Sequence, residues 1–111
     1  MFINEKDYEH KPLVNHYEKV YLKLGEINII LGEDEHVPKY FGKAIQYSIV
    51  SWDDYLLEIR GRIEKEIEKL FETDEPERAI YITENLIKYL ISNNLNKNLP
   101  EFIIKLSGYL K

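Results

Sequence analysis

Apolar side chains recur every three or four residues along nearly the whole chain, and this spacing predicts an all-α protein. The first helix is predicted from about residue 12 or 13 to residue 31, because Pro12 suits a first turn and Gly32 suits a helix end. Its apolar stripe is predicted to face the core and consists of Leu13, Tyr17, Val20, Leu24, Ile27 and Leu31.

A second helix is predicted to start at Pro38 after a polar loop at residues 33–36, with Phe41, Ala44, Ile45 and Ile49 on its inner face. Ser51 followed by Asp54 resembles a capping box with Asp in place of Glu, which favours a new helix start near residue 51. Two interpretations stay open here. Either the chain breaks near residues 50–51, or the second and third helices form one continuous rod.

The remaining helices have clear apolar faces. The third carries Trp52, Tyr55, Leu56, Ile59, Ile63, Ile67, Leu70 and Phe71, and ends at residues 73–76. The fourth starts at Pro76 or just after it, with Thr73 or Asp74 as its expected cap, and places Ala79, Ile82, Thr83, Leu86, Ile87, Leu90 and Ile91 inward. A short fifth runs from Pro100 through Phe102, Ile103, Leu106 and Leu110. With no dividing linker, the sequence predicts one domain at residues 1–111, a compact antiparallel bundle of about five helices.

Charge is distributed unevenly along the chain. Residues 1–77 hold 18 acidic and 10 basic side chains, a balance of −8, whereas residues 78–111 hold two acidic and five basic ones, a balance of +3. An acidic front makes nucleic acid an unsuitable partner, because phosphate binding needs clustered Lys and Arg. It suits a basic protein partner, which the negative charge would attract.

Most of the acidic side chains outside helices fall in two loops, at residues 33–36 and 72–77. If the chain reverses at each helix end, both loops lie at the same end of the bundle, because helix one ends where helices two and four begin. Seven carboxylates would then form one acidic pole: Glu33, Asp34, Glu35, Glu72, Asp74, Glu75 and Glu77. If helices two and three are continuous, the two loops lie at opposite ends.

No pattern of catalytic or cofactor-binding residues is present. The five glycines are scattered, so no phosphate-binding loop exists, and no serine lies in a nucleophile-elbow context. His10, His16 and His36 lie in polar or acidic stretches and are interpreted as surface residues. Glu33, Asp34, Glu35 and His36 are adjacent and cannot converge on one metal ion, so a solvated loop is the preferred interpretation. The sequence predicts no enzyme activity, no metal and no cofactor.

Localisation and glycine roles follow from simpler features. The chain has no cysteine, and it has neither a signal-peptide start nor an apolar run long enough to span a membrane, which together predict a cytoplasmic protein. Gly25, Gly42 and Gly61 lie inside predicted helices. Close helix packing or a local kink is the preferred reason for them, over a small basic spot at Arg60–Arg62.

The chain has nine tyrosines, a residue type that is common both at binding hot spots and at the edges of helical cores. Tyr17 and Tyr55 lie on apolar stripes and are predicted to be core residues. The tyrosines that lie off the stripes or at their margins are Tyr21, Tyr40, Tyr47, Tyr81 and Tyr89. We therefore expect a binding surface made of acids and tyrosines: Glu33, Asp34, Glu35, Asp53, Asp54, Glu58, Glu72, Asp74, Glu75, Glu77, Tyr40 and Tyr47.

The whole chain resembles small bacterial immunity proteins of colicin-type or contact-dependent growth-inhibition systems in its profile: short, acidic, cysteine-free, helical and tyrosine-rich. The stretch Trp52-Asp53-Asp54-Tyr55 is similar to the acidic and aromatic helix of the colicin-DNase type, but the double tyrosine of that family is missing, so no functional residue is carried over. The resemblance implies a tight one-to-one complex, formed by a monomer, that covers a nuclease toxin's basic active site or a surface beside it.

Three hypotheses follow. The first is an immunity protein that neutralises a basic, nuclease-type toxin. The second is a helical adaptor or structural subunit of a larger complex, which a homo-oligomer formed through the long third helix would favour. The third is an enzyme, which would need a concave pocket with converging ionisable groups.

Overall fold

A computed structural model describes residues 14–49 and 55–110, which form five α-helices and two short 3₁₀ turns without a strand. The helices are α2 (Val14–Leu31), α3 (Val37–Ile49), α4 (Tyr55–Glu72), α5 (Pro76–Ser92) and α6 (Pro100–Gly108). The turns are η1 (Asp34–His36), which leads directly into α3, and η2 (Asn96–Asn98) before α6. The all-α fold class is therefore confirmed. No helix in the described ranges is long and apolar enough to cross a membrane.

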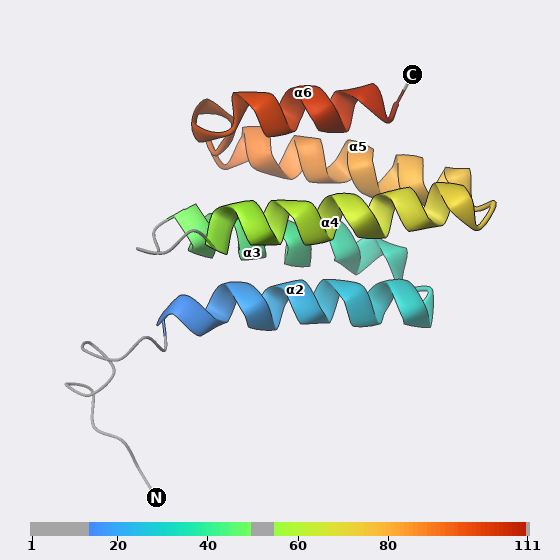
Figure 1. The fold of residues 1–111 in the computed structure, drawn as a ribbon, viewed down its shortest axis with the longest axis horizontal. Coiled ribbons are helices and arrows are strands. Elements are labelled where there is room, and N and C mark those ends of the chain that lie inside the picture. Colours follow the sequence, from blue (N-terminus) through green and yellow to red (C-terminus); the bar gives the residue numbers. More distant parts are fainter. Residues whose placement is uncertain (1–13, 50–54, 111) are drawn as a thin grey trace, which may run out of the picture.

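The helices lie side by side and successive ones run in opposite directions (Figure 1). α3 is central, since it contacts α2, α4 and α5, while α6 packs on the outer side of α5. α3 and α4 are separate helices, so the chain reverses between residues 49 and 55. Ser51 and the capping box expected there lie outside the described residues. The consequence of the reversal is that the loops after α2 and after α4 share one end of the bundle.

Three helices end with the same backbone motif. A residue in the left-handed conformation follows each helix closely: Gly32 after α2 (φ 78°), Asp74 after α4 (φ 66°) and Asn94 after α5 (φ 60°). The next amide in each case donates to a carbonyl five residues back, as in Glu75 N to Leu70 O at 2.8 Å. This Schellman geometry satisfies the last carbonyls of each helix. Asp74 therefore ends α4, and the expectation that Thr73 or Asp74 caps α5 is wrong, because the cap position is Glu75 and has no side-chain cap bond.

The core is built from the predicted inner faces of four helices. Fully or almost fully buried side chains include Phe41 and Ile45 of α3, Ile59, Ile63, Ile67 and Leu70 of α4, Ala79, Ile82, Leu86 and Leu90 of α5, and Phe102 and Leu106 of α6. Ile91 was expected to face inward with its neighbours on α5, but it is 51% exposed.

The inner face of α2 differs from the prediction. Tyr17, Val20, Ile27 and Leu31 were expected in the core but are 41–66% exposed. The buried face of α2 instead holds Leu22 and Ile29, together with the acidic side chains Glu18 and Glu26. A helix with apolar residues on two faces can bury either one, and here the face that contains Gly25, which has no side chain, lies against α3.

α6 is held against α4 by three polar or aromatic contacts at matched positions. The Lys105 amine lies 3.0 Å from the Glu64 carboxylate, and the Tyr109 hydroxyl donates to Glu68 Oε2 at 2.6 Å. The Arg60 guanidinium lies 5.1 Å from the centre of the Phe102 ring. Because Arg60, Glu64 and Glu68 lie on successive turns of α4, they contact α6 from its first turn to the residue that follows its end.

The Tyr109–Glu68 bond predicts a pH dependence. Burial and the hydrogen bond to Glu68 raise the pKa of the Tyr109 phenol above its usual value. The phenol therefore ionises more readily in the unfolded chain, so its stabilising contribution is complete below about pH 10 and is lost as pH rises toward the folded-state pKa. We expect Tyr109→Phe to lower the free energy of unfolding by about 1–2 kcal/mol at pH 8.

Urea denaturation of the wild type and Tyr109→Phe at several pH values between 8 and 11 measures this dependence. The difference between the two free energies of unfolding should shrink above pH 10. Only the wild type has a phenol at position 109, and its ionisation in the unfolded chain favours unfolding. A difference that stays constant over that range contradicts the assigned hydrogen bond.

Candidate protein-binding surface

The two acidic loops lie at one end of the bundle, as predicted. We call the set Glu33, Asp34, Glu35, Glu72, Asp74, Glu75 and Glu77 the acidic pole. The segment after α2 supplies the first three. The others are Glu72 at the end of α4, Asp74 and Glu75 in the loop that follows, and Glu77 on the first turn of α5. Both segments lie at the right-hand end of the molecule in Figure 1. The reversals of the chain bring together residues about 40 positions apart.

Arg78, on the first turns of α5, joins the two loops. Its guanidinium donates to both carboxylate oxygens of Asp34 at 2.8 Å, to Glu75 Oε1 at 2.8 Å and to the carbonyl of Ile29 at 2.6 Å. The hydrogen bonds to Asp34 and then to Glu75 raise the pKa of Arg78 above its usual value, so the side chain stays charged. This side chain fixes the end of α2, the η1 turn and the start of α5 relative to one another.

Arg78 pairs with two of the predicted site residues. Asp34 and Glu75 share the single positive charge of this side chain, and the three groups join the two segments of the pole. Asp74 adopts the left-handed conformation that ends α4. The remaining members of the pole have exposed side chains: Glu33, Glu35, Glu72 and Glu77.

His36 is an exposed member of the same loop, as expected for a surface histidine. Its imidazole Nε2 lies 3.9 Å from Glu33 and 3.7 Å from Glu35, distances that permit an ion pair only when the ring is protonated. No group of His, Asp and Glu side chains within the described part of the chain is arranged to hold a metal ion.

The other predicted site residues are not brought to the pole. Asp53 and Asp54 lie outside the described residues. Glu58 is exposed on the first turn of α4, at the end of that helix opposite to its acidic loop. The predicted acidic surface is therefore divided, and the part that the structure assembles is the pole.

Tyr40 and Tyr47 belong to a different group, a row of stacked rings between α2 and α3. The Tyr21 ring lies 5.5 Å from Tyr47 and 6.2 Å from Tyr40, and Tyr47 also contacts Tyr17 at 5.3 Å. Tyr40 and Tyr47 are half-buried in these contacts, which makes them packing residues of the α2–α3 pair. Tyr17, expected in the core, is half exposed at the edge of the row.

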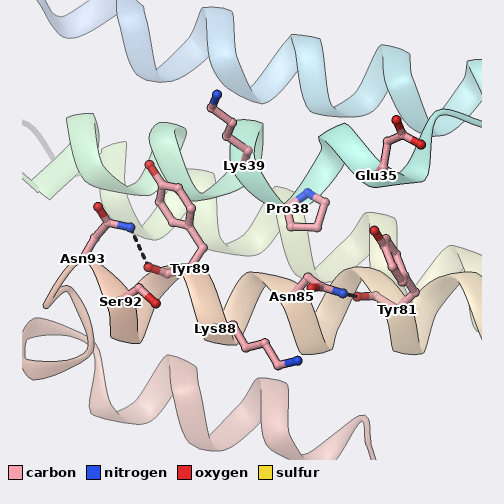
Figure 2. A pocket seen from close by; sticks show the side chains of 9 residues that line it. All are labelled: Glu35, Pro38, Lys39, Tyr81, Asn85, Lys88, Tyr89, Ser92 and Asn93. Atoms are coloured by element: carbon pink, nitrogen blue, oxygen red, sulfur yellow. Dashed lines mark hydrogen bonds between the residues drawn. The ribbon is translucent and has the colours of Figure 1, made fainter.

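A hollow opens at the acidic pole and continues as a groove between α3 and α5. The hollow has a volume of about 340 Å³ and is lined by Gly32, Asp34, Glu35, Glu77, Arg78 and Tyr81. The groove has a volume of about 290 Å³ and is lined by Glu35, Pro38, Lys39, Tyr81, Asn85, Lys88, Tyr89, Ser92 and Asn93 (Figure 2). Glu35 and Tyr81 line both, so the two shallow depressions adjoin each other, and together we call them the pole groove.

The pole groove changes character along its length. Carboxylates of Glu35 and Glu77 lie at the pole end together with the Tyr81 ring. The amines of Lys39 and Lys88 lie further along and point to opposite sides of the groove, and the Tyr89 ring lies near the other end. The side-chain amides of Asn85 and Asn93 donate to backbone carbonyls of their own helix at 2.8 Å. One N–H of each amide is thereby occupied, and the groove offers rings, amines and amide groups to a partner.

Tyr89 fixes one wall of this groove. Its hydroxyl donates to Gln46 Oε1 at 3.3 Å, and its ring lies against Gly42, where no side chain intervenes. Burial raises the pKa of the Tyr89 phenol, with the nearby Tyr21 and Tyr47 adding to the shift. The phenol therefore keeps a neutral hydroxyl, and the ring lies between α3 and α5.

The sequence analysis did not identify the groove, although the residues that form its α5 wall share one helix face and could have been recognised from their spacing. Tyr81, Asn85, Lys88, Tyr89 and Ser92 recur every three or four residues and so share one polar and aromatic face of α5. Their opposition to Pro38 and Lys39 depends on how α3 packs against α5, which the spacing alone does not specify.

Comparison of the chain with protein-family models, with curated proteins and with solved structures finds no match.

Proposed function

We propose that this chain is a binding protein that neutralises a basic protein partner, of the kind a nuclease-type toxin domain would be, by covering its active site. The observation that carries the proposal is the pole groove, where exposed carboxylates from two loops surround a hollow lined by Tyr81. Tyr81 is 42% exposed there, which leaves a large ring available as an anchor beside the charges.

The electrostatics supports a basic rather than an acidic partner. At this end of the bundle, exposed carboxylates outnumber the basic groups, because Arg78 is already paired with Asp34 and Glu75. The exposed carboxylates are those of Glu33, Glu35, Glu72 and Glu77. Lys and Arg side chains that hold a nucleic-acid phosphate in an enzyme would find matching acceptors here. Such long-range attraction accelerates association and weakens with added salt.

The lysines of the groove refine this proposal. A partner segment lying along it would place basic side chains at Glu35 and Glu77, and acidic or carbonyl groups near Lys39 and Lys88. A uniformly basic surface fits only the pole end. The pole groove thus favours a partner whose basic site is bordered by an acidic or polar segment.

Co-expression with the product of the gene immediately upstream tests the proposed function. A basic toxin domain encoded there should co-purify with this chain in a one-to-one ratio of chains and lose its toxicity. A neighbouring product that neither co-purifies nor is neutralised contradicts the proposal.

Charge reversal tests which surface is used. We expect Glu35→Lys/Glu77→Lys to slow association with the co-purified partner at least tenfold, because both side chains are exposed and line the hollow at the pole. The measurement is stopped-flow or surface-plasmon-resonance kinetics at low and moderate salt.

The matched control is Glu84→Lys/Glu101→Lys, which makes the same change in net charge at exposed positions on α5 and α6 away from the pole. It should slow association much less. Equal effects of the two double variants would mean that total charge, and not the pole groove, governs the encounter.

A second candidate function, a helical subunit of a larger assembly, is favoured by a different observation. The outer face of α2 exposes several large apolar side chains, of which Ile30 is 82% exposed. The long α4, expected to supply such an interface, instead buries its apolar stripe within the chain.

A further inference from the structure

The outer face of α2 carries a regular apolar row, which we call the α2 stripe: Tyr17, Val20, Leu24, Ile27 and Leu31. Four of these side chains are 41–66% exposed, and Leu24 is half-buried. The stripe is separate from the core face of the same helix. Soluble monomers expose single apolar residues commonly, but a contiguous row along a whole helix marks an interaction surface.

The spacing of the α2 stripe specifies the shape of its partner. Its members are separated by three, four, three and four residues, which is the heptad repeat of a coiled-coil seam. This repeat keeps apolar side chains facing a neighbouring helix over several turns, whereas an irregular surface needs no such regularity. An α-helix is therefore the element that fits along the stripe.

A second copy of this chain supplies such a helix. A two-fold axis at Leu24 places Leu24 against its copy and Tyr17 opposite Leu31 of the other copy, because the stripe extends seven residues to each side of Leu24. We propose that the protein forms a symmetric dimer in which the α2 stripes of two copies pack antiparallel.

Charge selects the antiparallel direction. The acidic pole lies at the Leu31 end of α2, so parallel helices would bring two acidic poles together. In the antiparallel dimer the poles lie at opposite ends of the pair, separated by roughly the 27 Å length of an 18-residue helix. That separation exceeds the screening length of about 8 Å at physiological salt, so the repulsion between poles is small.

The size of the surface fits a dimer that dissociates on dilution. With Ile30 beside the stripe, the exposed apolar area of two copies is on the order of 1,000 Å², just below the ~1,200 Å² at which specific stable interfaces begin. We therefore expect a dissociation constant in the micromolar range for this dimer. Because the pole groove is formed mainly by α3, α5 and η1, each copy keeps its groove open in the dimer.

Sedimentation equilibrium of the full chain between about 5 and 500 µM tests the proposal, a range chosen around the expected micromolar dissociation. The wild type should approach twice the 13.3 kDa mass of one chain at the upper end. The variant Val20→Glu/Ile27→Glu should remain monomeric throughout, with an unchanged far-ultraviolet circular dichroism spectrum, because both positions are exposed.

The control variant Ile91→Glu/Ile104→Glu introduces the same charges at exposed positions on α5 and α6 and should dimerise like the wild type. A wild type that is monomeric at every concentration overturns the proposal and leaves the stripe to another occupant, such as residues 1–13 or a different protein. A dimer that survives Val20→Glu/Ile27→Glu overturns it as well.

Single cysteines test the direction, since the chain has none of its own. Leu24→Cys should form a disulfide-linked dimer under mild oxidation, because residue 24 meets its copy at the axis. Val20→Cys should not, since two copies of residue 20 lie roughly 12 Å apart along antiparallel helices and a disulfide needs Cα atoms within about 7 Å. Cross-linking of both variants would show parallel helices, and cross-linking of neither would show that the stripe is not the interface. Each result would overturn the proposal.

This test is independent of the proposed function. Glu35→Lys/Glu77→Lys should leave the sedimentation of the free protein unchanged, and Val20→Glu/Ile27→Glu should leave the association rate per chain with the basic partner unchanged. Failure of one proposal therefore does not imply failure of the other.

Discussion

Gly25→Ala should destabilise the protein by about 3 kcal/mol, at the upper end of the cost of overpacking a core. A methyl group at Gly25 would overlap the edge of the Phe41 ring, which is fully buried and has no solvent-facing space to move into. The only relief is a shift of α2 away from α3, which also disturbs the aromatic row between those helices. A loss of this size is a large part of the 5–15 kcal/mol that stabilises a typical domain.

Urea denaturation measures this effect, and Gly61→Ala is the matched control. Gly61 also lies inside a helix, but no atom lies near the place of its missing side chain. Alanine there should stabilise the protein by up to about 1 kcal/mol, because glycine is the poorer helix former. Two alanine variants that change the free energy of unfolding in the same direction would contradict the assigned close approach at Gly25.

The same variants separate the explanations offered for the mid-helix glycines. Close packing accounts for Gly25, against Phe41, and for Gly42, against Tyr89. Gly61 has no such neighbour, so packing does not explain it within the described residues. Gly42→Ala should cost less than Gly25→Ala, because Tyr89 is only half-buried and its ring can swing toward the groove.

Arg78→Met should lower the free energy of unfolding by about 2 kcal/mol and weaken binding to the basic partner. The loss combines the hydrogen bonds to Asp34, Glu75 and the Ile29 carbonyl, discounted because the Arg78 side chain is 26% exposed and that of Glu75 is 42% exposed. Binding weakens because the two acidic loops lose the group that holds them together, although the pole becomes more negative.

Lys88→Met is the control, since it removes one positive charge from an exposed position on the same helix. It should change stability by no more than about 0.5 kcal/mol. Arg78→Lys should recover less than half of the loss, because an ammonium group lacks the fork that reaches Asp34 and Glu75 together. If Arg78→Met instead tightens binding in proportion to its added negative charge, the prediction is wrong, and the fixed geometry of the pole does not matter for binding.

The helices themselves could be predicted because each has a local signal. Pro76 and Pro100 begin α5 and α6, Gly32 follows α2, and apolar residues on α4 and α5 repeat with the period of a helix. The shared end of the two acidic loops followed from the expected chain reversal near residue 51. These features depend on neighbours in sequence, which is why a single sequence reveals them.

The orientation of α2 could not be predicted, because the helix has two apolar faces. The stripe containing Val20 and Ile27 has the more regular spacing, whereas the buried face includes Glu18 and Glu26. Periodicity does not rank two such faces. The ranking depends on Gly25 admitting Phe41 of α3 and on Arg62 of α4 pairing with Glu26 at 2.9 Å, and both partners are distant in sequence.

The site, like the fold, could be predicted only where the signal lies in neighbouring residues of the sequence. The carboxylates of the pole are visible in the sequence, but Arg78 reaches Asp34 across 44 residues, so its neutralising role needed the structure. Tyr40 and Tyr47 were expected to contact a partner and instead stack within the α2–α3 pair. The tyrosines that line the pole groove are Tyr81 and Tyr89.

Amide hydrogen exchange of the free chain and of its complex with the upstream-encoded basic protein tests the choice of surface most directly. The pole groove predicts slower exchange on binding in residues 32–36, 76–82 and 85–93, with little change along α6. Protection confined to α6 or to the outer face of α4, with the pole unchanged, would contradict it.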